Sequence, residues 1–167
     1  MESSLKLLQD QLVALLPRLR RFARSLTHHA ADADDLVQLA LERALQKIEQ
    51  WRAGTRLDSW MFGIMHNAWI DEIRARRRRD RVLAPEEAGE HVADVASEAP
   101  IQRLSLEAAF AQLPEEQRVA VSLVLVEGLA YKEAAAVLEV PIGTVTSRIA
   151  RGRATLSALL GGAEGAL

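Results

Sequence analysis

The 167-residue sequence contains no cysteine. This absence excludes disulfides, thiol redox sensing and thiolate zinc sites, and it agrees with a reducing compartment. No uninterrupted apolar run approaches about 18 residues, so the sequence predicts no membrane-spanning helix. The N-terminal segment MESSLKLLQDQ lacks the apolar stretch of a secretory signal. We therefore expect a cytoplasmic protein that does not insert into a membrane.

Patterns for catalysis and metal binding are missing as well. There is no Gly-rich phosphate loop, no Ser-His-Asp arrangement and no pair of carboxylates at a catalytic spacing. Metal-ligand spacing is absent from the four histidines, which are His28, His29, His66 and His91. We expect that the chain is not an enzyme and needs neither a metal nor another cofactor.

The chain has almost no net charge, with a formal value of -2, but its charges are segregated. A basic block is made of Arg74, Arg76, Arg77, Arg78, Arg79 and Arg81. An acidic block follows and contains Glu86, Glu87, Glu90, Asp94 and Glu98. The distribution matters more than the sum, so a local cationic binding surface can exist on a nearly neutral molecule.

Apolar residues recur at helical spacing through the first half of the chain. They predict a helix over residues 5–16, a second helix that could begin at Pro17 and reach residue 26, and a third over residues 32–50. A short loop follows at residues 51–56. The arginines at positions 18, 20, 21 and 24 are better explained by solvation of a helix surface than by a contact site.

The segment 57–79 is the one around which the sequence is organised. Its spacing predicts an amphipathic helix, with Trp60 and Trp69 on the side of the core. The other face carries His66 and Asn67, and the end of the helix is the run of arginines. Arginines suit phosphates, whereas amides and aromatic rings suit bases, so this helix could lie against nucleic acid. The alternative is a core helix with a solvated basic tail.

Residues 82–100 have a proline near each end, many acids and little helical periodicity, which predicts a flexible acidic linker. The sequence therefore divides into a domain over residues 1–81, the linker 82–100, and a domain over residues 101–167. Further helices are expected from residue 101 to Pro114, from Pro114 to residue 127, over 131–138 and over 142–160. No segment predicts a strand. The fold class is all-α, with two small helical domains that we expect to be independent.

Residues 131–153 have the layout of a helix-turn-helix. The first helix is short and rich in alanine, and the second places Val145 and Ile149 inward, four residues apart. Hydroxyl groups and arginines on the exposed face of the second helix suit the major groove of DNA. They are Thr144, Thr146, Ser147, Arg148 and Arg151. A plain helical hairpin would give the same pattern.

Three segments carry a resemblance to a known family. The stretch LPEEQRVAVSLVLVEGLAYKEAAAVLEVPIGTVTSRIARGRATL resembles the promoter-binding C-terminal domain of extracytoplasmic-function (ECF) sigma factors of the sigma-70 family. The stretch DADDLVQLALERAL resembles their segment that binds core polymerase, and LDSWMFGIMHNAWIDEIRARRRR resembles their minus-10 recognition segment. The joint occurrence of the three segments in this order is highly specific.

The resemblance implies three sets of site residues. Docking on the clamp helices of the largest polymerase subunit falls to Asp35, Leu36, Val37, Gln38 and Arg43. Minus-10 recognition, with a base flipped into the loop 51–55, falls to Trp51, Arg52, Gly54, Thr55, Asn67, Arg74, Arg77 and Arg78. Minus-35 recognition falls to Thr144, Thr146, Ser147, Arg148 and Arg151. An aromatic ring and a hydrogen-bond donor in the loop suit an unstacked base.

The partners implied by the resemblance are core RNA polymerase, promoter DNA and an inhibitory anti-sigma factor, in a pathway that responds to stress or another signal. Two other functions stay open. One is a sigma mimic that only titrates an anti-sigma factor. It would not need the arginines at 74–79 or Arg148 and Arg151, and charge reversal of these arginines separates the two functions. The other is a DNA-binding regulator that acts without polymerase, which would leave the DDLVQ segment unexplained.

Overall fold

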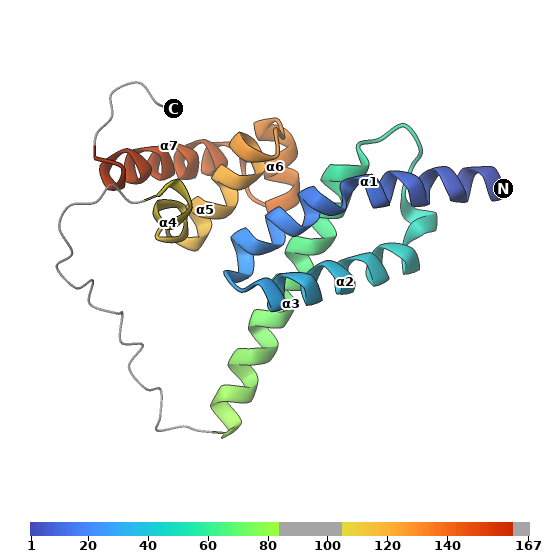
Figure 1. Ribbon diagram of the computed structural model, residues 1–167, viewed down its shortest axis with the longest axis horizontal. Coiled ribbons are helices and arrows are strands. Elements are labelled where there is room, and N and C mark those ends of the chain that lie inside the picture. Colours follow the sequence, from blue (N-terminus) through green and yellow to red (C-terminus); the bar gives the residue numbers. More distant parts are fainter. Residues whose placement is uncertain (84–104, 162–167) are drawn as a thin grey trace.

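The computed structural model describes residues 1–83 and 105–161, and these residues form helices and turns without any strand (Figure 1). The first module contains α1 (Glu2–Thr27), α2 (Ala30–Gln46), the short turn η1 (Ile48–Gln50) and α3 (Leu57–Leu83). The second module contains α4 (Leu106–Ala111), α5 (Glu115–Val121), η2 (Ser122–Val126), α6 (Tyr131–Leu138) and α7 (Ile142–Leu159). The predicted all-α fold class is confirmed.

The prediction that Pro17 begins a new helix is wrong, because α1 runs through it without a break. Proline has no N–H, so the carbonyl of Val13 loses its usual helical donor. Val13 and Pro17 are both exposed, so water can supply the missing hydrogen bond. Leu12 and Leu19, on either side of the proline, are both buried. Burial of this leucine face keeps the helix continuous, which the local proline signal does not reveal.

The three helices of the first module pack around an aromatic pair. Phe22 of α1 and Phe62 of α3 meet edge to face, with ring centroids 5.1 Å apart. Met61 and Met65 of α3 are fully buried beside them. Such an aromatic pair adds roughly 0.5–1.5 kcal/mol beyond its burial. Trp60 and Trp69, on either side of these residues in α3, pack partly buried against the same core, as predicted.

The ends of α2 and α3 differ from the prediction by a few residues. α2 stops at Gln46 and a 3₁₀ turn covers residues 48–50, so the predicted helix to residue 50 is tightened at its end. The loop 51–56 is confirmed, and Gly54 has a positive φ of 90° there. α3 continues to Leu83, so residues 82 and 83 of the predicted linker are helical. The remainder of that linker prediction falls outside the described residues.

The second module is built on the crossing of α5 and α7. Gly152 of α7 is buried at this crossing, where an added Cβ would lie 2.7 Å from Cγ2 of Val121. After Val121 the helix widens into η2, a π-helical turn, and Gly128 ends it with a φ of 75°. The turn between α6 and α7 passes through Glu139, whose φ of 56° is left-handed. The helix-turn-helix prediction for this region is confirmed.

The two modules are not independent in the structure, contrary to our expectation. One core of buried residues runs through both, from Leu19 and Phe62 in the first module to Leu123 and Ala134 in the second. Helix α6 lies against α3, and α5 lies against α1 (Figure 1). Apolar stripes in a sequence show that a helix face is buried but not which helix covers it. The sequence pattern therefore could not predict the contact between the two modules.

Candidate functional site

A cleft of about 570 Å³ opens beside the loop 51–56. It lies between α1 and the start of α3 and is lined by Gln11, Ala14, Leu15, Arg18, Trp51, Gly54, Thr55, Leu57 and Asp58. Three of the residues predicted for base capture, Trp51, Gly54 and Thr55, are brought together here. The wall from α1 was missed by the sequence analysis. Its residues are spaced at i, i+3, i+4 and i+7 from Gln11, a helical spacing that could have placed them on one face.

Trp51 is half-buried in this cleft, and its indole nitrogen has no hydrogen-bond partner. Within residues 1–83 and 105–161, Nδ1 of His66 is the other buried side-chain polar atom that has no hydrogen-bond partner. A buried N–H without an acceptor costs about 1–3 kcal/mol. The cleft itself offers an aromatic ring and, on α1, the guanidinium of Arg18, whereas the indole N–H of Trp51 is closed to solvent.

The segment of α2 predicted to bind polymerase presents a mixed surface. Asp35 and Gln38 are exposed, whereas Leu36 and Val37 are mostly buried in the core. Arg43 is half-buried and forms an ion pair of 2.9 Å with Asp71 of α3. A second cleft, of about 500 Å³, joins this segment to α1 and is lined by Leu16, Arg20, Arg24, Asp34, Val37, Gln38 and Leu41. The accessible part of the predicted segment is thus Asp35, Gln38 and part of Arg43, whose side chain is 31% exposed.

The polar face of α3 is divided between solvent and the second module. Asn67 is exposed, but its neighbours His66 and Trp69 are partly covered. The indole N–H of Trp69 donates a 2.9 Å hydrogen bond to Glu115 of α5. Arg52 in the loop is exposed as well, about fifteen residues from Asn67 along the chain. The residues predicted for minus-10 recognition therefore form separate groups along the loop and α3.

The arginine-rich end of α3 extends away from the other helices (Figure 1). Arg74, Arg77 and Arg78 are exposed there. Arg76 and Arg79 instead bind Glu72, at 3.0 and 3.3 Å, and Arg76 also lies over the ring of Trp69. Two of the arginines thus form ion pairs within the helix, but Arg76 and Arg79 remain exposed as well, with side chains 47% and 62% exposed.

The predicted minus-35 residues occupy the first half of α7. Thr146 and Arg151 are exposed, while Thr144 and Ser147 are half-buried. The hydroxyl groups of Thr146 and Ser147 donate to carbonyls of their own helix, at 3.1 and 3.0 Å. The Arg148 side chain is only 20% exposed and lies 3.6 Å from Glu116 of α5. Of the five residues predicted to read the minus-35 element, two are therefore exposed on α7 and three are partly buried.

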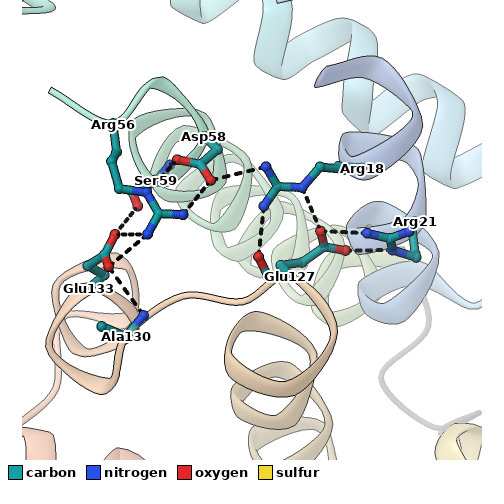
Figure 2. A network of polar contacts seen from close by, with 8 residues as sticks. All are labelled: Arg18, Arg21, Arg56, Asp58, Ser59, Glu127, Ala130 and Glu133. Atoms are coloured by element: carbon teal, nitrogen blue, oxygen red, sulfur yellow. Dashed lines mark hydrogen bonds and ion pairs between the residues drawn. The ribbon is translucent and has the colours of Figure 1, made fainter. Parts of the chain in front are cut away.

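A network of ion pairs joins the modules at the centre of the molecule (Figure 2). Glu127, which follows η2, has a side chain that is 0% exposed. Its carboxylate accepts hydrogen bonds from Arg18 at 3.1 Å and from Arg21 at 2.7 and 2.8 Å, and its carbonyl accepts another from Arg18 at 2.8 Å. The bond to Glu127 raises the pKa of Arg21. The expectation that these two arginines only solvate a helix is therefore wrong.

A second set of contacts continues this network to α6 (Figure 2). Arg56 bridges Asp58 of α3 and Glu133 of α6, at 2.7 Å from each. Glu133 also accepts hydrogen bonds from the hydroxyl of Ser59, at 2.9 Å, and from the backbone N–H of Ala130, at 3.2 Å. Burial alone raises the pKa of Asp58, but bonds from Arg56, the Ser59 N–H and Arg18 outweigh it, and the net pKa is lowered.

Two further observations concern other classes of site. In the part of the chain that the structure describes, no three histidine, aspartate or glutamate side chains gather as metal ligands would. Of the helices described, none has the length and apolar character needed to cross a membrane.

Comparison with protein families gives two matches. The model described as the sigma2 domain of PhyR matches residues 12–66. The model described as sigma-70, region 4, matches residues 103–156. The two matches fall in the first and second modules respectively, so each contains a separately recognised domain.

Individual proteins are similar over almost the whole chain. The ECF RNA polymerase sigma factor EcfG of Rhodopseudomonas palustris is 41% identical over 158 residues, which cover 92% of this chain and 84% of that protein. A solved structure of the sigma factor RpoE in complex with the anti-sigma factor NepR, from Bartonella quintana, is 34% identical with a TM-score of 0.76, covering 93% of this chain and 97% of that one. The structure of CnrH with the cytosolic domain of CnrY is 28% identical with a TM-score of 0.61, covering 91% and 88%.

Proposed function

Because this chain belongs to the ECF sigma factors of the sigma-70 family, we propose that it directs core RNA polymerase to specific promoters and initiates transcription there. The observation that carries this proposal is the 41% identity with EcfG, which extends through both modules in one chain. No catalytic step belongs to the chain itself. Binding free energy is used instead to unstack and hold promoter bases.

The first module provides the polymerase contact and the minus-10 contact in this proposal. Asp35 and Gln38, exposed on α2, meet the clamp helices of the polymerase. The cleft beside Trp51 receives a flipped base, which stacks on the indole ring. Stacking of this kind is worth roughly 1–3 kcal/mol per base. Asn67 reads a minus-10 base, and the exposed Arg74, Arg77 and Arg78 bind phosphates.

The second module reads the minus-35 element with α7. Thr146 and Arg151 are already accessible, and Thr144, Ser147 and Arg148 complete the surface. Arginine can pair with guanine through two hydrogen bonds in the major groove, and hydroxyl groups can bind either phosphates or base edges. The domains in this proposal are those predicted from the sequence, over residues 1–81 and 101–167.

The regulatory partner is an anti-sigma factor that works with this chain in the cytoplasm. One solved structure described above contains a sigma factor bound to the anti-sigma factor NepR, and the other contains CnrH bound to the cytosolic domain of CnrY. The similarity to these sigma factors extends over both modules, which supports a partner that engages the two together.

The test is co-elution with bacterial core RNA polymerase from a sizing column. We expect stoichiometric co-elution of the wild-type chain and its loss in Asp35→Arg, because the reversed charge lies in the proposed docking surface. Asp10→Arg is the matched control: it makes the same charge reversal at an exposed position near the start of α1 and should co-elute normally. If the folded wild-type chain fails to bind, a sigma mimic or a stand-alone regulator becomes the better proposal.

A further inference from the structure

Glu127 closes the structure by binding two arginines of the other module at once (Figure 2). We propose that Glu127 is a latch that holds the two modules in a closed, autoinhibited arrangement, and that opening exposes Arg18 and Arg21 to a phosphate of the promoter strand. The promoter part of this inference rests on the proposed function. The latch itself rests on the contacts between the modules.

The closed arrangement cannot engage both promoter elements together. Ser59 and Trp69 of α3 are hydrogen-bonded at 2.9 Å to Glu133 and Glu115 of the second module. The two DNA-reading surfaces therefore lie within the dimensions of one small domain. Elements at minus-10 and minus-35 are separated by about 25 base pairs, or ~85 Å at about 3.4 Å per base pair. The modules must separate before α3 and α7 can reach both.

The connection between the modules is long enough for that movement. Residues 84–104 link the last described residue of α3 to the second module. At about 3.3–3.6 Å per residue, a segment of this length reaches on the order of 70 Å when extended. Separation is thus limited by the contacts across the interface and not by the covalent connection. The Glu127 side chain, at 0% exposed, makes part of these contacts.

The geometry of the latch resembles the geometry of phosphate binding. The Glu127 carboxylate receives one N–H from Arg18 and two from Arg21, which is the forked pattern that arginine forms with carboxylates and phosphates alike. A phosphate could replace this carboxylate without any change in the donors. The acidic residue of the second module thus occupies the position that an anion of the promoter backbone would take.

Arg18 connects the latch to the cleft beside Trp51. This arginine lines that cleft, binds Asp58 in the wall of the cleft at 3.1 Å, and stacks its guanidinium 5.4 Å from the ring centroid of Phe62. Two of its N–H groups are at the same time committed to Glu127. A DNA strand that enters the cleft therefore meets an arginine whose N–H groups already bind Glu127 of the second module. Binding of the strand to Arg18 thus competes with closure of the two modules.

The first measurement is energy transfer between two dyes in the free chain. Because the sequence has no cysteine, Glu42→Cys and Ser157→Cys, both exposed and in different modules, allow labelling at these two sites alone. In this background we expect Glu127→Gln to lower the transfer efficiency, because the amide cannot hold two guanidinium groups as the carboxylate does. Glu107→Gln is the matched control: it removes the same charge from an exposed position in α4 and should leave transfer unchanged.

The second measurement is the affinity of core RNA polymerase carrying this chain for a promoter with both elements. A closed population lowers the apparent promoter affinity in proportion to its share, so polymerase with Glu127→Gln should bind the promoter at least about fivefold more tightly than with wild type, the lower end of usual coupling between sites. Arg21→Gln, which leaves Arg18 on Glu127, should give an intermediate result in both measurements. Circular dichroism would reveal whether Glu127→Gln unfolds the chain. In that case Arg21→Gln keeps the test valid, because it changes a half-exposed side chain.

The outcomes separate the latch from the proposed function. Equal transfer efficiency in Glu127→Gln, Arg21→Gln and Glu107→Gln would overturn the latch, whatever the promoter result. Lower transfer with unchanged promoter affinity would overturn autoinhibition. If the wild-type chain and all variants fail to bind polymerase, the proposed function and autoinhibition both fall, while the transfer measurement still decides whether Glu127 closes the chain.

Discussion

Single side chains on α3 divide into those that solvent can reach and those that the second module covers. Asn67 belongs to the first group, although its neighbour His66 and the nearby Trp69 are partly buried. A base-reading role needs a side chain that keeps its donor and acceptor available. The amide of Asn67 meets that condition in the closed chain, so its role does not depend on opening.

We expect Asn67→Ala to impair minus-10 discrimination while leaving polymerase binding intact. Loss of a specific amide–base contact costs about 1–3 kcal/mol of discrimination against the wrong base. The fold should tolerate the change, because the side chain is exposed and alanine favours helix. The measurement is the ratio of transcription from promoters that differ at one minus-10 base, beside co-elution with polymerase. Equal losses in the two assays would remove Asn67 from the base-reading set.

Sequence reasoning succeeded at residues whose role is set by their own helix. Trp60 and Trp69 were predicted to be core residues from helical position alone, and both pack against the core. It failed for Arg18 and Arg21, which were interpreted as solvated but bind Glu127 across more than 100 positions of sequence. A charge pattern shows that a cation is on a surface, but it does not show which distant acid will meet it.

At the scale of elements, the crossing of α5 and α7 depends on the absence of a side chain at Gly152. The space that a Cβ would need is taken by Val121 of α5. Other glycines of the same module differ: Gly143, also in α7, has no heavy atom within 4 Å of the place a Cβ would occupy. The two positions therefore give opposite expectations for the same substitution.

We expect Gly152→Ala to destabilise the chain by about 1–3 kcal/mol, the usual cost of overpacking a tight contact. Gly143→Ala should be neutral or stabilising by up to about 1 kcal/mol, because alanine is the better helix former and nothing opposes its methyl group. Thermal and urea unfolding of the two variants, followed by circular dichroism, measures both effects. A crossing that tolerated Gly152→Ala as well as Gly143→Ala would show that α5 and α7 adjust their distance freely.

Most element boundaries could be predicted from local signals. Gly128 ends its helix, α6 spans residues 131–138, and the loop 51–56 separates α2 from α3, all as the sequence indicated. The exceptions have physical causes outside the local pattern. α1 passes through Pro17 because buried leucines on both sides hold it, and η2 widens in a stretch that reads as regular helix.

At the scale of the whole molecule, the interface between the modules contains a histidine, His66, whose pKa is lowered. Burial lowers the pKa of His66, Glu115 and Glu139 partly oppose this shift, and Arg148 adds to it. All three charged residues belong to the second module. Burial and Arg118 likewise lower the pKa of His28, with His29 adding to the shift and Glu115 opposing it. When the modules separate, these surroundings are lost and the pKa of each returns toward about 6.5.

The sign of the pH dependence follows from this difference. Below about pH 6.5 the separated or unfolded chain binds protons that the closed chain does not, so the closed arrangement loses stability as the pH falls from 6.5 toward the lowered pKa. Above that range its stability is fully present. We expect energy transfer between dyes at positions 42 and 157 to decrease between pH 7.5 and pH 5.5, and His66→Gln to make this decrease smaller. An identical pH profile in the variant would show that His66 does not report on closure.

The organisation of the whole molecule was the least predictable level. Composition and helical periodicity indicated two helical modules, and the resemblance carried by three segments indicated their functions. Neither signal predicted that Leu123 and Ala134 would share a core with Leu19 and Phe62. Such contacts depend on the fit of two surfaces formed by distant parts of the chain, which local patterns do not encode.

The π-helical turn η2 also constrains how this chain can evolve. The N–H of Glu127 donates to the carbonyl of Ser122, five residues back, so η2 accommodates one residue more than an α-helix would over the same span. A π-turn takes up an extra residue locally, so the segments on either side of it keep their facing. The same extra residue in a regular α-helix would turn everything that follows by about 100°. The turn at η2 therefore lets this helix hold one residue more and still present Glu127 to Arg18 and Arg21 of α1, so the length of this segment is open to selection independently of its amino acids.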